Sequence, residues 1–277
     1  MTKAQLSLAA QSFLATNSCN YVQKADAMCE DLVGMRIYDS PVLAIGSATD
    51  TLFDKLKQPD VVHPEYMLPS DWLPGAQRVI SFFAPFTEQV KSANALAGSV
   101  ADEWLHARVE GQEAILALCG YLCDKLRQSG HPSVAPMLDP RIQMLDRFKS
   151  NWSERHTAFI CGLGTFGVSK NLITEKGAAG RFGSIITSCQ LLVTERRYDN
   201  PYAYCALCGL CAKHCPAQCI ALARGAHHAK EHPPCVEYLD QMKSLPPRGQ
   251  SKKVRYGCGK CQTMVPCGDR IPVEAMR

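Results

Sequence analysis

One stretch of the chain decides the fold, and it reads Cys205-Ala206-Leu207-Cys208-Gly209-Leu210-Cys211-Ala212-Lys213-His214-Cys215-Pro216. Its cysteines recur at spacings of three, three and four residues, and a proline follows the last of them. A cubic iron–sulfur cluster needs four thiolates. One tight loop delivers three of them, while the fourth cysteine of the run points toward a second cluster. Because the proline stops this loop from continuing as a regular helix, the spacing predicts an iron–sulfur centre.

The rest of the tail supplies the other ligands that two clusters require. It contains a further group of cysteines, namely Cys219, Cys235, Cys258, Cys261 and Cys267. By the rule for bacterial ferredoxins, Cys205, Cys208 and Cys211 share one cluster with a late cysteine. Cys215 then joins three others on a second cluster, which leaves one cysteine to spare. Zinc also takes four thiolates, and a zinc site could add the nearby histidines His227, His228 and His232. On the cluster interpretation these histidines lie in a solvated linker.

Composition sets further bounds on the class of protein. The chain has 277 residues, of which 46% are hydrophobic, and a net charge of +4. This balance favours neither nucleic acid nor a membrane surface as a partner. The first residues have no signal-peptide pattern, and no apolar run approaches the ~20 residues of a membrane helix. With 15 cysteines, the chain is therefore expected to be a reduced, cytoplasmic protein whose cysteines are mostly metal ligands.

The hydrophobic pattern predicts a mixed α/β fold. Apolar spacing indicates helices over 4–32, 51–57 and 98–129, and a further helix over 152–161. Short buried strands are expected over 42–46, 78–83, 134–136, 184–187 and 191–193. After a boundary near 196–201 the chain is rich in cysteine and proline, and bound clusters would stabilise so small a unit. We therefore expect a larger cofactor-binding α/β domain over residues 1–195 and a small cluster domain over residues 196–277.

A glycine-rich segment is the candidate cofactor contact. Gly162, Gly164 and Gly167 formally match G-x-G-x-x-G, but a dinucleotide site also needs an acidic residue ~20 positions later, and none stands there. Glycines otherwise let the backbone approach something large and flat, or simply form a surface turn. The candidate contacts in this segment are Gly162, Leu163, Gly164, Phe166 and Gly167.

These motifs together resemble those of epoxyqueuosine reductase and, more remotely, of the corrinoid reductive dehalogenases. The resemblance covers most of the chain. Its motifs are Trp72-Leu73-Pro74-Gly75-Ala76, Glu154-Arg155 before Gly162-Leu163-Gly164, the run from Cys205 to Pro216, Cys235-Val236-Glu237-Tyr238, and Tyr256-Gly257-Cys258-Gly259-Lys260-Cys261-Gln262. The resemblance implies a nitroreductase-like α/β sandwich that holds cobalamin, followed by a ferredoxin-like domain with two 4Fe–4S clusters.

The resemblance also assigns the ligands of each cluster. The first cluster would be held by Cys205, Cys208, Cys211 and Cys267. The second would be held by Cys215, Cys235, Cys258 and Cys261, with Cys219 left as a small residue near the clusters. One departure concerns the last ligand, because Val265 stands at the family's position and Cys267 follows Pro266 instead.

Two other departures concern the reaction. Phe148 stands where epoxyqueuosine reductase has an aspartate that resembles its proton donor, and the C-terminal helical-repeat region is expected to be missing. The alternative proton donors are Asp146, Glu154, His156 and Tyr66. We therefore expect an iron–sulfur oxidoreductase that passes electrons through two clusters to a cobalamin-type cofactor. It would act on a small substrate and accept electrons from a ferredoxin- or flavodoxin-type donor. The alternative is a non-catalytic electron-transfer or cobalamin-handling protein.

Overall fold

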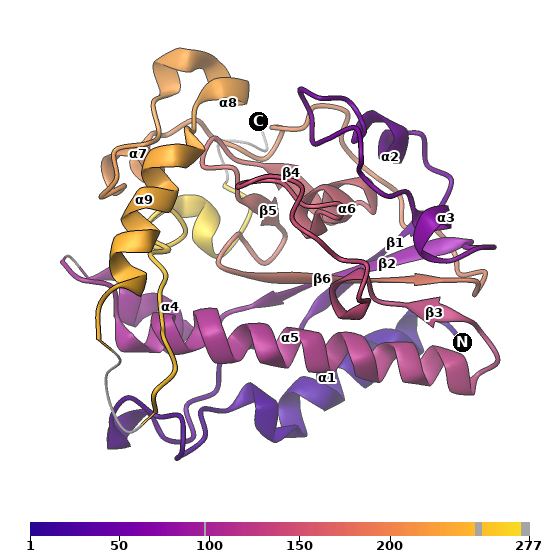
Figure 1. Cartoon of the computed structure of the whole chain (residues 1–277), viewed down its shortest axis with the longest axis horizontal. Helices are drawn as coiled ribbons and strands as arrows, with labels where there is room; N and C mark the ends of the chain where they lie inside the picture. Colours follow the sequence, from indigo (N-terminus) through magenta and orange to yellow (C-terminus); the bar gives the residue numbers. More distant parts are fainter. Residues whose placement is uncertain (97, 247–250, 273–277) are drawn as a thin grey trace.

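The computed structural model describes residues 1–96, 98–246 and 251–272 (Figure 1). The strands are β1 (Val42–Ser47), β2 (Arg78–Pro85), β3 (Ser133–Val134), β4 (Gly164–Phe166), β5 (Leu172–Thr174) and β6 (Gly180–Thr187). The α-helices are α1 (Lys3–Thr16), α2 (Leu52–Lys55), α3 (Pro69–Trp72), α4 (Glu88–Ala95), α5 (Asp102–Gln128), α6 (Glu154–Ile160), α7 (Leu210–Lys213), α8 (Gly225–His228) and α9 (His232–Lys243). Short 3-10 helices are η1 (Ser18–Asn20), η2 (Glu30–Leu32), η3 (Pro136–Leu138), η4 (Leu222–Arg224) and η5 (Pro266–Gly268).

The central sheet is antiparallel, with strand order β1-β2-β6-β3. Ile45 of β1 lies opposite Ile80 of β2, which in turn lies opposite Ile185 of β6. The short strands β4 and β5 form a separate hairpin. The mixed α/β class is therefore confirmed.

Side chains alternate between the two faces of the sheet, so each face has its own core. Ile45, Ile80 and Ile185 pack against α1 and α5 on one face, whereas Val79 and Ile186 pack with Trp152 and other residues of the α2, α3 and α6 region on the other. Figure 1 shows this arrangement, with α5 and α1 below the sheet and α2, α3 and α6 above it. The strand pattern in the sequence is explained by this two-sided burial.

The long helix α5 lies below the central sheet in Figure 1, next to α1. Its first turn carries Asp102 and Glu103 and its last turn carries Lys125 and Arg127. The acidic residues therefore lie at the positive N-terminal end of the helix dipole and the basic residues at the negative C-terminal end, which stabilises the helix. Buried residues recur along it at helical spacing, and Gly130, with φ of 81°, follows its end. Among the described residues, no helix is both long enough and apolar enough to cross a membrane.

Two expected elements differ in the structure. The helix expected over 4–32 ends at Thr16, because the side chain of Asn17 accepts a hydrogen bond from the backbone N–H of Cys19 at 3.0 Å and starts a 3-10 turn instead. The strand expected over 191–193 is absent from that described segment, where Leu192 is 91% exposed. The helices within 98–129 and 152–161 and the strands near 42–46, 78–83 and 184–187 are confirmed.

The cysteine-rich tail docks on α4 and α5. Lys260 is buried, and its ammonium group donates to the carbonyls of Asn94, Leu96 and Ser99 at 2.9–3.2 Å where α4 ends. Asn94 in turn donates to the carbonyl of Cys258 at 2.9 Å. In Figure 1, α9 stands over the N-terminal end of α5. The late cysteines are therefore held against the α/β core rather than on a free tail.

Candidate metal and cofactor site

Four cysteines surround a small cavity, called here the first cavity. They are Cys205, Cys208, Cys211 and Cys267, the set expected for the first cluster. The cavity measures about 20 Å³ and is also lined by Val168 and Val265. Cys208 is exposed, so this cavity lies near the surface.

The other predicted set surrounds a larger cavity, the second cavity, which measures about 190 Å³. Its cysteines are Cys215, Cys235, Cys258 and Cys261, together with Cys219. Cys235 lies in the first turns of α9, whereas Cys258 and Cys261 come from the loop after the buried Arg255. Gly259 in that loop has φ of 67°, and a Cβ there would lie 2.0 Å from the ring of Trp104, so only glycine fits.

The loops between these cysteines carry unusual backbone strain. The described residues include four non-glycine residues with positive φ, and three of them, Leu207, Gln218 and Met264, lie within the cysteine-containing segments. Such a conformation costs about 1–3 kcal/mol and persists where the surroundings fix it. It bends each loop so that the sulfurs surround a cavity.

The geometry differs from that of a single-ion site. Within the described ranges, no three or more His, Cys, Asp or Glu side chains gather in a way that could hold one metal ion. A zinc ion needs its sulfurs about 2.3 Å from one point, whereas these thiols stand around open volumes. His227 and His228 are exposed at the end of the short helix α8, and His232 is the first residue of α9, so the segment expected to be a linker is partly helical.

Apolar surroundings suppress ionisation of the free thiols. Burial, with a smaller contribution from neighbouring thiols, raises the pKa of Cys211 and of Cys267 to about 12. Burial likewise raises the pKa of Cys258 to about 11. A bound cation must displace these protons, so metal binding and proton release are coupled at both cavities.

A neutral amide links the α/β region to the second cavity. The side chain of Asn171, just before β5, donates to Sγ of Cys261 at 3.3 Å. The amide of Gln262 donates to Oδ1 of Asn171 at 2.8 Å and fixes its orientation. A hydrogen bond to a ligand sulfur is one of the features that set a cluster's potential. The sequence offered no signal for Asn171, because the contact depends on the tertiary fold.

Cys219 is a fifth thiol at the second cavity. It is buried, and its sulfur lies 3.4 Å from that of Cys215. Two sulfurs this close together cannot both bind separate corners of one cubic cluster. Its position agrees with the expectation that Cys219 is the spare residue near the clusters, although that assignment stays a prediction.

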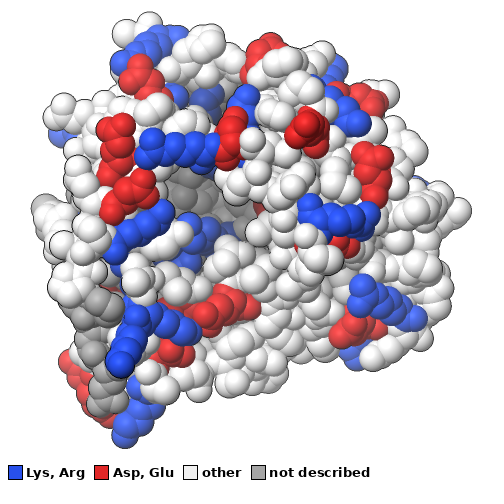
Figure 2. All heavy atoms as spheres, in the orientation of Figure 1, with Lys and Arg blue, Asp and Glu red and all other residues white. Residues whose placement is uncertain are grey.

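Cationic side chains form part of the wall of the second cavity. Arg108, Arg181 and Lys230 line it, together with Trp104 and Tyr238. In the space-filling view this face is hollowed near α9, and Lys and Arg side chains lie at the edge of the hollow together with Asp and Glu side chains (Figure 2). These cations come from segments far apart in the chain, so sequence reasoning did not find them.

Burial and nearby cations both lower the pKa of two histidines outside this wall, His156 and His232. Burial, followed by repulsion from Arg155 and Lys170, lowers the pKa of His156 to about 4. Burial, followed by repulsion from Lys230, Arg155 and Lys170, lowers the pKa of His232 to about 4. Burial is the larger cause of both shifts, and the nearby cations add to it.

The glycine-rich segment makes contacts within its own chain. A Cβ on Gly164 would lie 2.0 Å from the carbonyl oxygen of Ile173, so this glycine permits the close β4–β5 hairpin. Gly162 has φ of 92° and packs beside the backbone of Arg196. Gly167 lines the first cavity. A role for Gly162, Leu163, Gly164, Phe166 and Gly167 in contacting a cofactor stays a prediction.

The four candidate proton donors do not line the second cavity. Asp146 accepts hydrogen bonds from the backbone of Phe148 and Lys149 in its own turn. His156 is within 2.7 Å of the hydroxyl of Ser153. The carboxyl oxygens of Glu154 and the hydroxyl of Tyr66 are buried without a hydrogen-bond partner in the described structure. Among the described wall residues, Tyr238 and Lys230 carry exchangeable protons closer to the cysteines, and no carboxylate lines the cavity.

The fold is found in two groups of solved structures. One is an epoxyqueuosine reductase with a tRNA-Tyr epoxyqueuosine-modified stem loop, which is 19% identical, with a TM-score of 0.52. Another is the catabolic reductive dehalogenase NpRdhA with 3-bromo-4-hydroxybenzoic acid, which is 17% identical, with a TM-score of 0.51. This chain has the fold that they share.

The matches cover most of this chain but only part of its neighbours. They span 86% of the chain and 64% of the epoxyqueuosine reductase, and 84% of the chain and 30% of NpRdhA. No family model and no curated protein sequence matches the chain.

Proposed function

We propose that this chain is an iron–sulfur oxidoreductase with two 4Fe–4S clusters, one in each cavity. The observation that carries the proposal is the division of the tail cysteines. Cys205, Cys208, Cys211 and Cys267 surround one cavity, and Cys215, Cys235, Cys258 and Cys261 surround the other. The thiols, the apolar walls and the bent loops all suit a cubic cluster. When bound, such clusters supply one-electron carriers.

Residues of the chain support each part of an electron path. Cys208 is exposed, so a ferredoxin- or flavodoxin-type donor would deliver electrons at the first cavity. Apolar side chains between the cysteine loops, including Val168 and Ile220, exclude water from the inner sulfurs. Arg155 lies near Cys261 and Cys235, and its charge offsets that of the thiolates of the second set. The open mouth of the second cavity, beside the second cluster, is then the place where a reducible group would accept the electron.

A cobalamin-type cofactor is the proposed acceptor. One neighbour with this fold is described in terms of B12-dependent dehalogenation, and the sequence motifs resemble those of corrinoid enzymes. The second cavity measures about 190 Å³ inside and about 850 Å³ with its open mouth. Because the second cluster would fill the inner part of this cavity, a macrocycle would have to lie in the open mouth; ligand sites usually measure about 300–1,000 Å³. Trp104, Tyr238 and the amide of Gln262 would contact it, and a bound corrin would supply a cobalt centre that accepts electrons.

Under this proposal, residues 1–195 form a nitroreductase-like cofactor domain and residues 196–277 a ferredoxin-like cluster domain. Phe148 at the family's aspartate position supports a substrate other than epoxyqueuosine. The lack of a carboxylate among the described wall residues favours the alternative, an electron-transfer or cobalamin-handling protein without catalysis of its own.

Anaerobic titration of the iron-loaded protein with hydroxocobalamin tests the cofactor. We expect stoichiometric binding with a shifted visible spectrum. Cobalt should then be reduced when dithionite reduces the protein. Binding without reduction would favour a cobalamin-handling role. No binding at micromolar concentrations would refute the cobalamin assignment and leave an electron carrier.

A further inference from the structure

The walls of the two cysteine-lined cavities differ in charge. Arg108, Arg181 and Lys230 line the second cavity, whereas no described Lys, Arg, Asp or Glu lines the first. Clusters with four thiolates each have the same type and charge, so their surroundings decide which of them is reduced more easily. Because a nearby positive charge stabilises the more negative, reduced state, the second cavity favours reduction.

A further cation lies inside the loop that carries two of the second set of cysteines. Lys260 stands between Cys258 and Cys261 in the sequence and is 7% exposed. Its ammonium group donates to three backbone carbonyls around the C-terminal end of α4, at 2.9–3.2 Å. An ammonium has three N–H donors and a neutral amine has only two, so three carbonyl acceptors match the charged form of this side chain.

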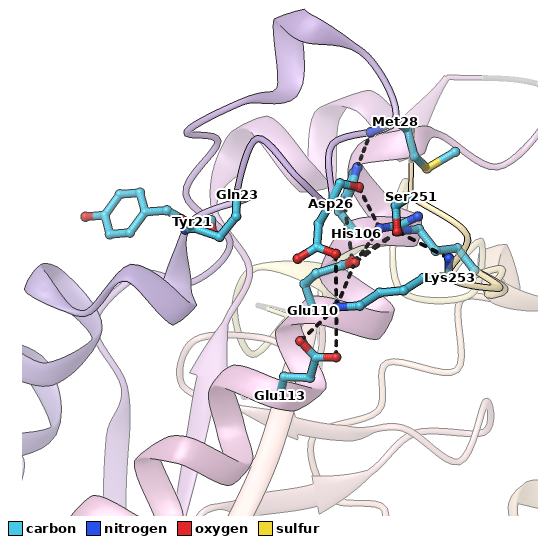
Figure 3. Close-up of polar contacts among 10 residues, drawn as sticks. Tyr21, Gln23, Asp26, Met28, His106, Glu110, Glu113, Ser251 and Lys253 are labelled. Atoms are coloured by element: carbon cyan, nitrogen blue, oxygen red, sulfur yellow. Dashed lines mark hydrogen bonds and ion pairs between the residues drawn. The ribbon is translucent and has the colours of Figure 1, made fainter. Parts of the chain in front are cut away.

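The neighbouring cations of the same segment are neutralised by carboxylates. Arg255 pairs with Glu110, and Lys253 pairs with Asp26 and Glu113. Figure 3 shows Asp26, Glu110, Glu113 and Lys253 pointing toward one another in a separate network. The positive charges of this network are therefore offset within the network and act little on the cysteines.

Lys260, by contrast, carries a charge that no carboxylate offsets. Its hydrogen-bond partners are neutral carbonyls, and none of the carboxylates in the described part of the chain forms an ion pair with it. In a buried site the effective dielectric constant is far below that of water, so solvent and salt screen such a charge little. The charge of Lys260 therefore acts on the thiolates of its own loop, Cys258 and Cys261.

We propose that Lys260 raises the reduction potential of the second cluster above that of the first, so that an electron received at the first cavity passes inward. In that step the first cluster loses one electron and the second cluster gains it. The inference rests on the proposed function, because it needs both clusters. Lys260 acts through its charge, while its three hydrogen bonds hold the loop against α4, and substitutions separate these two roles.

Redox titration of the anaerobic, iron-loaded protein, followed by electron paramagnetic resonance, tests the inference. Cys235→Ser, which should keep only the first cluster, identifies the signal and the midpoint potential of that cluster. In the wild type the other signal should titrate at the higher potential. Lys260→Met should shift the reduction equilibrium of the second cluster ~10-fold or more toward the oxidised form, which is a fall of about 59 mV for one electron, and should leave the first cluster unchanged.

Two further substitutions separate charge from hydrogen bonding. Lys260→Gln keeps N–H donors for the carbonyls but has no charge, so it should lower the potential of the second cluster as Lys260→Met does. Lys260→Arg keeps the charge and should retain most of the wild-type potential. Lys55→Gln, at an exposed lysine of α2, is the matched control and should leave both potentials unchanged.

Iron content and unfolding temperature are measured on the same samples, so that a misfolded variant is recognised. If the first cluster of the wild type has the higher potential, the inference is wrong, while two cluster signals leave the proposed function standing. An unshifted second potential in iron-loaded Lys260→Gln, or loss of the second cluster in both Lys260→Gln and Lys260→Arg, would make this lysine a structural anchor and overturn the inference. Absence of both cluster signals in the reconstituted wild type would refute the proposed function and this inference with it.

Discussion

Arg255 and Glu110 form a buried ion pair that fixes the position of the second cysteine loop. Nη2 of Arg255 donates to Oε1 of Glu110 at 2.5 Å, and the two side chains are 3% and 6% exposed. Met28 donates its backbone N–H to Nε2 of His106, so Nδ1 of this histidine carries the proton that Glu110 accepts at 3.1 Å. Since Cys258 follows Arg255 by three residues, the pair ties a cluster ligand to α5.

Replacing Arg255 with methionine should therefore destabilise the protein. Glu110 would remain buried without its charged partner, which costs about 3–5 kcal/mol. Denaturant unfolding of the anaerobic protein measures this loss, and iron content should fall at the same time because Cys258 is no longer held. Arg197→Gln is the matched control at an exposed arginine. A stability change below about 1 kcal/mol, the size of a surface ion pair, would refute a structural role for the pair.

The pKa of Glu110 predicts sensitivity to acid. Burial alone would raise it, but hydrogen bonds from His106 and Arg255 and the charge of Arg255 lower it to about 2, from an ordinary value of 4.5. The unfolded chain therefore binds more protons between these pH values, and stability is lost as pH falls through this window. Glu110→Gln should remove this dependence. Identical slopes of unfolding free energy against pH from 5 to 2 in variant and wild type would contradict the assignment.

Glu154 should show the opposite pH dependence. Burial raises its pKa from an ordinary 4.5 to about 7, against a smaller opposing effect of the nearby Ser184 and Trp152 side chains. The folded chain holds this proton more tightly, so stability falls as pH rises from 4.5 to 7 and is flat above. Glu154→Gln should be more stable than the wild type at pH 8 by up to about 3 kcal/mol and nearly equal at pH 4.5. Thermal or denaturant unfolding at the two pH values checks this; equal differences at both would contradict it.

Asn171 should raise the potential of the second cluster. Its hydrogen bond to Cys261 stabilises the more negative, reduced state. Asn171→Ala should lower the midpoint potential by roughly 40 mV, the equivalent of one hydrogen bond of about 1 kcal/mol. Gln262→Leu removes the hydrogen bond that orients Asn171 but leaves the one to Cys261, so it should have a smaller effect. Redox titration followed by electron paramagnetic resonance measures both, and an unchanged or raised potential in Asn171→Ala would reject this role.

Cys219 should be dispensable for cluster binding. Cys219→Ser should keep about eight iron atoms per chain, whereas Cys235→Ser should retain about four, because each cubic cluster contains four. The two variants differ only in which thiol of the second cavity is removed. Loss of iron in Cys219→Ser with retention in Cys235→Ser would exchange the proposed roles of these residues.

Local signals explain what could be predicted from the sequence. Short, nearly continuous apolar runs located β1, β2 and β6, because these strands are buried on both faces of the sheet. The spacing from Cys205 to Cys215 predicted bent ligand loops, since that geometry depends on residues close in the chain. The early helix was predicted too long because the capping side chain of Asn17 overrides apolar periodicity. Arg108 and Arg181 were not identified, because only the packing of α5 against β6 brings them together.

The central claim is that two cubic clusters occupy the two cysteine-lined cavities. Quantification of iron, acid-labile sulfide and zinc in strictly anaerobic, reconstituted wild-type protein tests it most directly. We expect about eight iron and eight sulfide per chain, with little zinc. About one zinc per chain and no sulfide, or iron that stays near four after full reconstitution, would contradict it.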